Sequence, residues 1–290
     1  MQYRYAVYYV PEQHSPLYAA GSALLGYDAR TGQSVPTPCL PLPRDLPHDL
    51  PHDLSWESLV AEPTRYGLHA TVVAPFFPLH SSEDALADTL RLFCQRMAAV
   101  LTPLRVVEHR GFLALMPDVP GVPNATNVPD APGVTSAPDA SDKAGTSGEA
   151  DAPGSANVSG RRAMAALRHM AGEATRVFAP LRRPAPEAET LRRAKGLTNR
   201  QLAFLRTWGY PYVFEEYDFH ISLTGPSTAS PALGKVVAAY LADSIAQPQN
   251  VASLSLCRQP VDENHEPGKP CTGRFRVLES FPLSSTGIEQ

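Results

Sequence analysis

The stretch at residues 66–76, YGLHATVVAPF, decides how the rest of the chain is interpreted. It is apolar and β-branched apart from one histidine and one threonine, which is typical of a buried β-strand. Alternate side chains of a strand share a face, so His69 and Thr71 point to one side while Ala70 and Val72 point to the other. A single pair of this kind is most simply a core histidine hydrogen-bonded to a neighbour, and a second copy is needed to indicate more.

That second copy lies 151 residues further along the chain. In residues 218–226, DFHISLTGP, His220 and Ser222 repeat the His-x-hydroxyl spacing, and the alternate positions are again apolar. We expect the two copies to occupy corresponding places in two halves of the chain and to face one cleft. A shared site explains both copies better than two unrelated core histidines.

The paired motif suits the chemistry of phosphate esters. In-line displacement at phosphorus needs a base on one side and an acid on the other, and histidine, with an ordinary pKa of about 6.5, serves either role near neutral pH. We therefore predict His69 and His220 as the catalytic pair, each fitting either role. The hydroxyls of Thr71 and Ser222 are predicted to bind the non-bridging phosphate oxygens and stabilise the charge that develops there.

The composition restricts the class of protein. The chain has 290 residues, of which 43% are hydrophobic, as expected for a globular protein with one large domain or two small ones. No apolar run approaches the roughly 18 residues of a membrane span, and the first residues, MQYRYAVYYV, read as a strand and not as a signal peptide. We expect a cytoplasmic protein without a membrane partner. Its four cysteines are widely spaced, which argues against a zinc site or a disulfide framework, and we expect no metal and no cofactor.

The net charge of −4 is concentrated in one segment. Residues 117–160 contain six acidic residues and one basic residue, so the remainder of the chain has a net charge of +1. This near-neutral remainder has no broad basic stripe of the kind that marks a nucleic-acid-binding face. A small anionic ligand held by a few arginines fits the composition better.

Two segments are predicted to lie outside the packed fold. Residues 117–160 lack aromatic residues, leucine and isoleucine and are rich in Pro, Ala, Gly, Ser and Asp, which predicts a disordered low-complexity insertion. Residues 35–54 form an irregular loop with a tandem repeat, DLPHDLPHDL. Its prolines keep the repeated histidines and aspartates from gathering as metal ligands.

The rest of the chain, residues 1–290 taken as a single domain, alternates strands and helices in an α+β pattern. We expect Pro75 to stop the first motif's strand and Thr198 to cap a helix. The predicted strands cover 3–10, 104–109, 111–117, 251–257 and 273–280, and the predicted helices cover 15–25, 82–101, 161–178 and 231–245. A further helical region is predicted over 187–208, and the helix capped by Thr198 begins within it.

At the level of motifs, H69-A-T71-V and H220-I-S222-L resemble the paired H-x-[T/S]-x signature of the 2H phosphoesterase superfamily. Within it, the chain most resembles a family of phosphonate metabolism proteins encoded beside carbon–phosphorus lyase genes. The similar segments are RYAVYYVP, RYGLHATVVAPF, GFLALMP, GLTNRQLAFLRTWGYPYVFEEYDFHISLTG and RFRVLESFPL. The resemblance covers most of the chain except the two loops.

The resemblance implies a bilobal fold in which two pseudo-symmetric lobes with antiparallel sheets form a central cleft. It also implies metal-independent hydrolysis of a cyclic phosphodiester, and the family's gene context suggests a phosphoribosyl 1,2-cyclic phosphate formed in phosphonate catabolism. Two alternatives stay open. One is a 2′,3′-cyclic phosphodiesterase acting on RNA ends, and the other is a non-catalytic phosphate-binding module.

The first motif departs from the family pattern, which has a lysine two positions after the threonine. Val73 stands there, on the same face as His69 if the strand alternates regularly. Arg65 is the nearest replacement for this cation. Arg4 and Tyr8, which share a face of the first strand, are further candidates for substrate binding.

Other residues near the motifs have less specific interpretations. Tyr66 and Tyr212 precede the two motifs, where packing is the simpler role, although Tyr66 is also a candidate for substrate binding. Asp218 or Glu216 is placed to orient the second histidine. The basic pair Arg192 and Arg193 suits either a distal phosphate or a helix surface, while His109 and His169, without hydroxyl partners, are interpreted as surface histidines.

Overall fold

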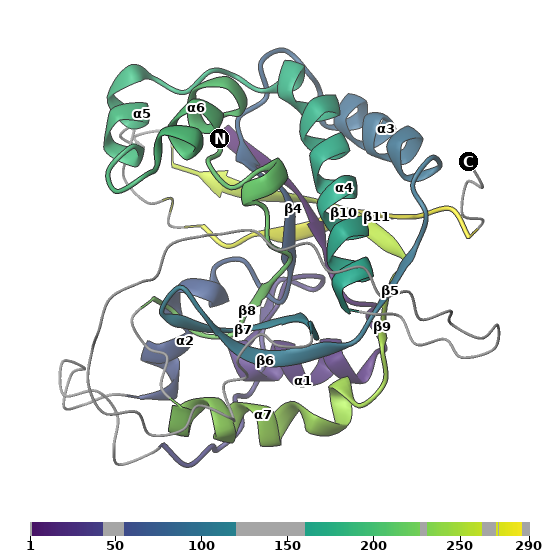
Figure 1. Ribbon diagram of the computed structural model, residues 1–290, viewed down its shortest axis with the longest axis vertical. Helices are drawn as coiled ribbons and strands as arrows, with labels where there is room; N and C mark the ends of the chain where they lie inside the picture. Colours follow the sequence, from purple (N-terminus) through teal and green to yellow (C-terminus); the bar gives the residue numbers. More distant parts are fainter. Residues whose placement is uncertain are drawn as a thin grey trace, which may run out of the picture.

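The computed structural model describes residues 2–42, 55–119, 160–226, 231–262, 271 and 273–285. Its main feature is an antiparallel sheet of seven strands. These are β1 (Gln2–Tyr9), β4 (Ala70–Phe76), β6 (Leu104–His109), β7 (Phe112–Pro117), β8 (Ile221–Ser222), β10 (Ser253–Val261) and β11 (Arg276–Pro282). Their order across the sheet is β11-β10-β1-β4-β8-β7-β6, which places β4 and β8, the strands of the two motifs, side by side (Figure 1).

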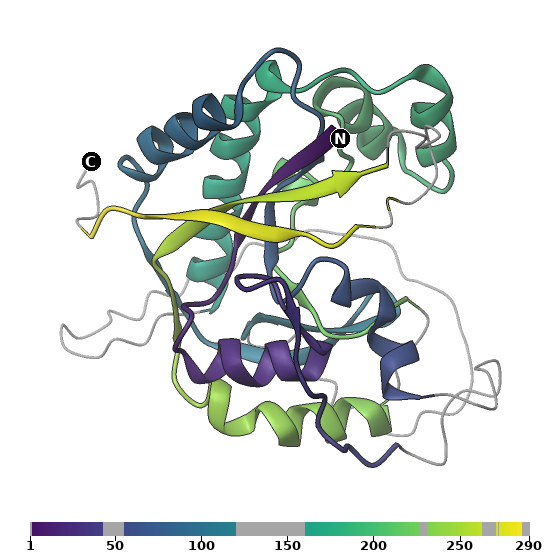
Figure 2. The same cartoon turned by 180° about the vertical axis from the view of Figure 1, so that it is seen from behind.

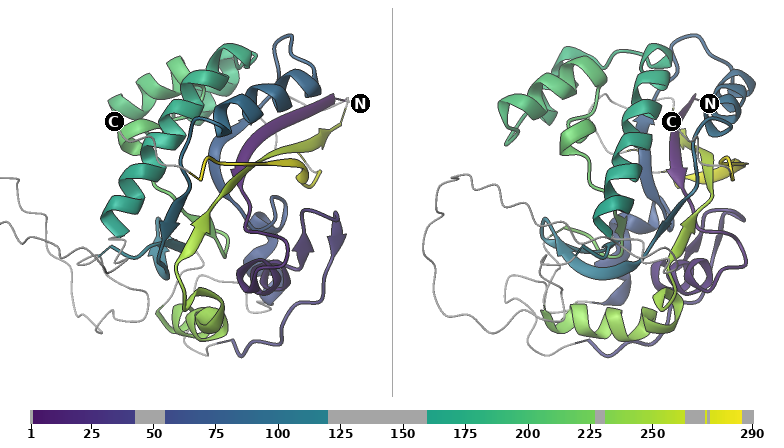
Figure 3. Two further views of the ribbon diagram at one scale, coloured as in Figure 1. Left: turned by 90° about the vertical axis from the view of Figure 1, so that its right-hand side faces the viewer. Right: turned by 45° about the vertical axis from the view of Figure 1, so that its right-hand side comes forward.

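Helices pack around both ends of this sheet. They are α1 (Pro16–Leu25), α2 (Trp56–Thr64), α3 (Glu83–Cys94), α4 (Gly160–Phe178), α5 (Glu187–Arg193), α6 (Asn199–Trp208) and α7 (Pro231–Ile245). Helix α4 contacts β4, and α3 contacts β10 and β11, whereas α7 lies beside α1 and against β6 (Figures 2 and 3). The helices thus form separate groups over the two halves of the sheet.

Local sequence signals explain most helix ends. Ser15 caps the start of α1 through its side chain, and Gly26 ends that helix in the left-handed conformation with φ 67°. Thr198 caps α6 as predicted, in a reciprocal arrangement with Gln201.

One predicted helix is too long. The helix expected over 82–101 begins at its Ser82 cap but ends at Cys94. Residues Val100–Thr102 instead form the short strand β5, paired with β9 (Gln249–Val251), so a partner distant in sequence overrides the local helical periodicity.

Strand β4 also differs from its prediction, because it continues through Pro75 to Phe76. Its register against β1 shifts between Tyr5 and Val7, where Pro75 lies. A residue in such an irregularity has no ladder hydrogen bond to lose, so the missing N–H of proline costs nothing there.

A second shift in the same pairing changes where Val73 lies. Thr71 pairs with Tyr8 but Val73 pairs with Val7, so β4 contains one extra residue at this point. The regular alternation that placed Val73 on the face of His69 therefore breaks. Val73 is a core residue with 2% exposure.

The α+β class and the antiparallel sheet agree with the sequence prediction. The two halves meet where β4 and β8 pair through Ala70 and Ile221 in a continuous sheet, and the bilobal 2H arrangement stays a prediction. Most of both predicted loops, namely 43–54 and 120–159, lies outside the described residues. Within the described part of the chain, none of the helices has the length and apolarity to cross a membrane.

Candidate functional site

The two His-x-hydroxyl motifs lie opposite each other on neighbouring strands. Ala70 of β4 pairs with Ile221 of β8, and extending this antiparallel register by one residue each way sets His69 opposite Ser222 and Thr71 opposite His220. Residues opposite each other in an antiparallel pair point to the same face. The four polar side chains therefore share one face, and Ala70 and Ile221 are fully buried on the other.

Both imidazole rings are held by the backbone in the same way. Nδ1 of His69 lies 2.9 Å from the carbonyl oxygen of Gly67, and Nδ1 of His220 lies 2.8 Å from that of Asp218. Because a carbonyl only accepts hydrogen bonds, each Nδ1 donates and each neutral ring keeps Nε2 free as an acceptor. Nε2 of His69 lies 3.4 Å from the hydroxyl of Thr71.

The loop before β4 requires glycine at residue 67. Its φ is 72°, and a Cβ there would lie 2.6 Å from the Cβ of Ala29. Only glycine adopts this conformation and fits this space without strain. Gly67 thus sets the carbonyl that orients His69.

Burial makes both histidines weak bases. It lowers the pKa of His69 to about 4, with a smaller contribution from the charge of His220. It also lowers the pKa of His220, against the hydrogen bond to the carbonyl of Asp218. Arg110 lowers the pKa of His220 further, and the carboxylate of Asp218 raises it. Both rings are therefore neutral at pH 7.

Aromatic side chains form a wall beside His69. The Tyr8 ring centroid lies 4.1 Å from that of His69, and the ring of Tyr66 stacks on the imidazole with the centroids 5.6 Å apart. Phe275 contacts both tyrosines from behind. This wall borders a cavity of about 310 Å³, lined by Tyr8, Tyr66, His69, Thr71, Tyr210 and Ser222 among others.

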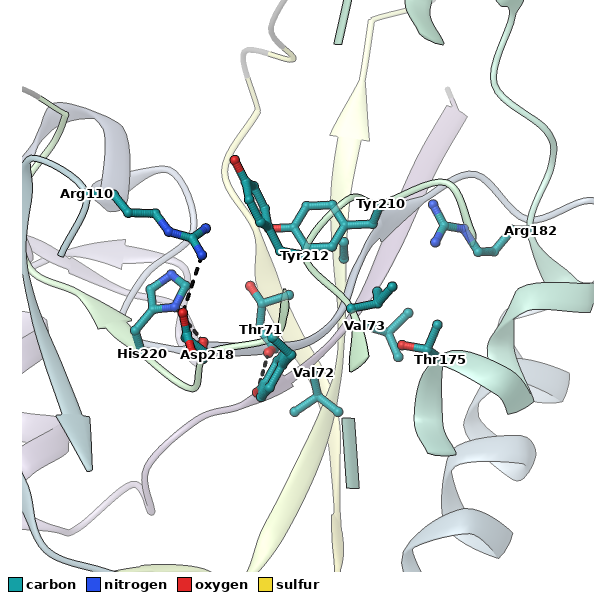
Figure 4. Close-up of a pocket in the computed structure, with 13 residues that line it drawn as sticks. Thr71, Val72, Val73, Arg110, Thr175, Arg182, Tyr210, Tyr212, Asp218 and His220 are labelled. Carbon is teal, nitrogen blue, oxygen red and sulfur yellow. Dashed lines mark hydrogen bonds and ion pairs between the residues drawn. The ribbon is translucent and has the colours of Figure 1, made fainter. Parts of the chain in front are cut away.

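A smaller hollow adjoins the cavity on the side of His220 (Figure 4). Thr71 and Tyr210 line both. Figure 4 shows His220, Asp218 and Arg110 at one side of this hollow and Arg182 at the other. Val73 lies beyond Thr71 as seen from His220, toward Arg182. The two hollows together give a cleft that is aromatic near His69 and cationic near His220.

Three of the predicted arginines lie away from this cleft. Arg65 is exposed at the end of α2 and lines neither hollow. Arg4 stacks over Phe275, 5.4 Å from the ring centroid, and donates to Gln259, so it lies behind the aromatic wall. Arg192 is exposed on α5, where its neighbour Arg193 pairs with Glu189.

The interpretation of His109 as a surface residue is wrong. Its ring centroid lies 4.9 Å from that of His220, and burial lowers its pKa to about 4. This contact could not be predicted from local sequence, because it depends on the pairing of β7 with β8, which brings the β6–β7 hairpin beside the strand of the second motif. His169 is exposed, as predicted.

Asp218 is the acidic residue that orients the second histidine, and it does so through its main-chain carbonyl. Its carboxylate pairs with Arg110 at 3.3 Å and with Arg168 at 3.4 Å. Glu216 instead accepts a hydrogen bond from Gln201. Sequence reasoning did not identify Arg110, Arg168, Arg182 or Tyr210, since nothing local links them to either motif.

Metal ligands do not gather within the described ranges. No group of three or more His, Cys, Asp or Glu side chains there is arranged to hold a metal ion, and the four cysteines form no disulfide with one another.

Comparisons with known proteins point to one group of relatives. Residues 155–265, which include His220 and Ser222, match the family described as "Protein of unknown function (DUF1045)". The chain is 29% identical over 294 residues to the ribose 1,5-bisphosphate phosphokinase PhnN of Janthinobacterium sp. (strain Marseille), covering 98% of this chain and 51% of that protein. It is 31% identical over 226 residues to the protein of the same name from Laribacter hongkongensis (strain HLHK9), covering 76% of this chain and 40% of that protein. The chain thus spans about half or less of the length of the curated relatives it matches.

Proposed function

We propose that the protein hydrolyses a cyclic phosphodiester without a metal ion, with His69 and His220 as general base and general acid. The observation that supports this most directly is the antiparallel alignment of the two motifs on β4 and β8. It places two imidazoles and two hydroxyls on one face beside a cavity, and it leaves each Nε2 available for proton transfer.

The surroundings of the two rings suggest which is the base. No carboxylate among the described residues raises the pKa of His69, so this ring stays neutral and accepts the proton of the attacking water. The carboxylate of Asp218 opposes the lowering of the pKa of His220 by burial, and a bound phosphate anion acts in the same direction, which favours the protonated form once substrate is bound. Its Nε2 donates the proton to the leaving alkoxide.

In this reaction the oxygen of water forms a new bond to phosphorus while one ring P–O bond breaks. One proton passes to His69 and another leaves His220, so the product is a phosphate monoester with a free hydroxyl. Thr71 and Ser222 stabilise the charge on the non-bridging oxygens by hydrogen bonding. Tyr8 and Tyr66 line the space for the rest of the substrate.

The substrate we favour is a phosphoribosyl 1,2-cyclic phosphate from phosphonate catabolism. The resemblance to the phosphonate metabolism family implies it, and the name of the curated relatives refers to a phosphorylated ribose. We do not extend the kinase activity to this chain, because the matched region is about half of the Janthinobacterium protein and less of the Laribacter protein. The 290 residues also contain no Gly-x-x-x-x-Gly-Lys-Ser/Thr phosphate-binding loop.

A panel of substrates tests the proposal. Purified protein is incubated, with EDTA present, with ribose 1,2-cyclic phosphates, 2′,3′-cyclic nucleotides and RNA ends carrying a cyclic phosphate. We expect hydrolysis of the ribose cyclic phosphate. Preference for the nucleotides or RNA ends supports the second candidate, and tight binding without turnover supports a binding module.

Asparagine variants give the sharpest test of the two histidines. The side-chain amide of His69→Asn or His220→Asn replaces Nδ1 as a donor to the carbonyl of residue 67 or 218 but supplies no Nε2. We expect each variant to lose at least about 100-fold in kcat. His169→Asn, at an exposed position on α4, is the matched control and retains full activity. Turnover that survives either active-site substitution contradicts the mechanism.

A further inference from the structure

The cleft needs a positive group to bind a phosphodiester, which is an anion at neutral pH. None of the described residues that line the larger cavity is a lysine or an arginine. The smaller hollow beside His220 is lined by Arg110 and Arg182. The choice between them depends on what each guanidinium already contacts.

The guanidinium of Arg182 is hydrogen-bonded to two main-chain carbonyl groups. Its Nη1 donates to the carbonyl of Trp208, and its Nη2 donates to that of Gly209 at 3.2 Å. These contacts hold the chain where α6 ends, next to Tyr210. Arg182 therefore has a structural role that accounts for its burial.

Arg110 has an unusual backbone conformation. It occupies the turn of the β6–β7 hairpin with φ 52°, and Gly111 follows with φ 85°. A two-residue hairpin turn with both φ values positive favours Asn-Gly, and an arginine in the first position costs free energy. Residues held in such conformations cluster at functional sites. We therefore expect the arginine side chain to have a function at this position.

The side chain of Arg110 is fixed in place yet keeps free donors. Its guanidinium stacks over Tyr212, 4.2 Å from the ring centroid, and its Nη2 lies 3.3 Å from Asp218 Oδ2. Asp218 also pairs with Arg168, so two guanidinium groups share one carboxylate and the cluster keeps a net positive charge. A guanidinium carries five N–H donors, more than this ion pair uses.

We propose that Arg110 binds the non-bridging oxygens of the substrate phosphate beside His220 and is the phosphate-binding cation of the cleft. The inference rests on the proposed function only for the identity of the substrate. Arg110 lines the same hollow as Thr71 and His220, and Figure 4 shows it on the side of His220, where a phosphate bound by the motif residues would lie. The planar guanidinium suits a phosphate through paired hydrogen bonds.

The conformation of the turn suggests which variant to test. Arg110→Asn removes the guanidinium and provides the residue that a turn with two positive φ values prefers, so the fold is retained. We expect the affinity for inorganic phosphate, measured by calorimetry, to fall roughly 10- to 100-fold, as for loss of a charge-assisted hydrogen bond. The midpoint of thermal unfolding stays the same or rises. Arg110→Lys keeps the charge and retains part of the affinity.

Arg176→Gln is the matched control. Arg176 also stacks on an aromatic ring, that of Phe214, and pairs with an acidic neighbour, Glu173, but it lines neither hollow. We expect its phosphate affinity to equal that of the wild type.

Phosphate affinity that is unchanged in folded Arg110→Asn overturns the inference, and so does a wild-type protein that does not bind phosphate at millimolar concentration. The assay needs no turnover, so it separates this inference from the proposed function. Loss of phosphate binding in Arg110→Asn supports the inference even if the wild type hydrolyses no cyclic ester.

Discussion

Burial of His69 makes the stability of the fold depend on pH. The folded protein holds its pKa at about 4, against 6.5 for the free side chain. In the intervening pH range the unfolded chain binds a proton that the folded protein does not. The contribution of His69 to stability is therefore complete above about pH 6.5 and is lost as the pH falls toward 4. At about 1.4 kcal/mol per pH unit, the loss is at most roughly 3 kcal/mol.

Urea unfolding of the wild type and of His69→Gln, at about pH 7.5 and about pH 4.5, measures this contribution. Glutamine does not titrate, so the variant loses only the stability that other groups lose, carboxylates included. We expect the free energy of unfolding of the wild type to fall by about 2–3 kcal/mol more than that of the variant between the two pH values. His169→Gln, changed at an exposed site, should behave as the wild type does. Equal losses in wild type and His69→Gln would refute the assignment of a half-buried, neutral His69.

Three further predictions concern the cleft. The pH profile of kcat/KM reports the ionisation of the free enzyme, in which the pKa values of both His69 and His220 lie below 6.5. We expect kcat/KM to peak below pH 6.5 and to fall at higher pH, where the base is already fully deprotonated and the acid loses its proton. A maximum above about pH 8 contradicts this. Within the described ranges the buried hydroxyl of Tyr8 has no hydrogen-bond partner, so Tyr8→Phe should raise the free energy of urea unfolding by up to about 1 kcal/mol; a clear loss of stability would mean that the hydroxyl is partnered. Gly67→Ala should lower the free energy of unfolding by about 2 kcal/mol, and it should lower kcat by displacing the carbonyl that holds His69. An unchanged midpoint of thermal unfolding would show that the loop relaxes freely.

The shared face of each histidine and its hydroxyl partner could be predicted from the sequence because it depends only on strand periodicity. His69 and Thr71 are two residues apart, as are His220 and Ser222, and strand alternation places each pair on one face whatever the partner strand. That β4 and β8 are neighbours does not follow from periodicity. The repeat of the motif in each half suggested it, and the register through Ala70 and Ile221 specifies how the strands align.

Predictions made from the periodicity of the sequence were wrong where strand pairing decides the local structure. The extra residue in β4 breaks the alternation before Val73, and no local signal in an apolar run marks such an irregularity. The helix expected over 82–101 was too long for a related reason. Residues 100–102 suit either a helix or a strand, and pairing with β9 decides between them.

The cation of the cleft illustrates what a motif leaves out. Strand periodicity relates Arg65 and Val73 to the first motif along a single element, and it does not show which side chains approach from other elements. The guanidinium that lines the hollow beside His220 belongs instead to the β6–β7 turn, and two contacts hold it there, the ring of Tyr212 and the carboxylate of Asp218. Its local sequence, Arg-Gly, is a poor version of the Asn-Gly turn, and only the positive φ of Arg110 shows that the chain tolerates the strain. A turn that keeps a disfavoured residue next to a half-buried histidine is best explained by what its side chain does in the cleft.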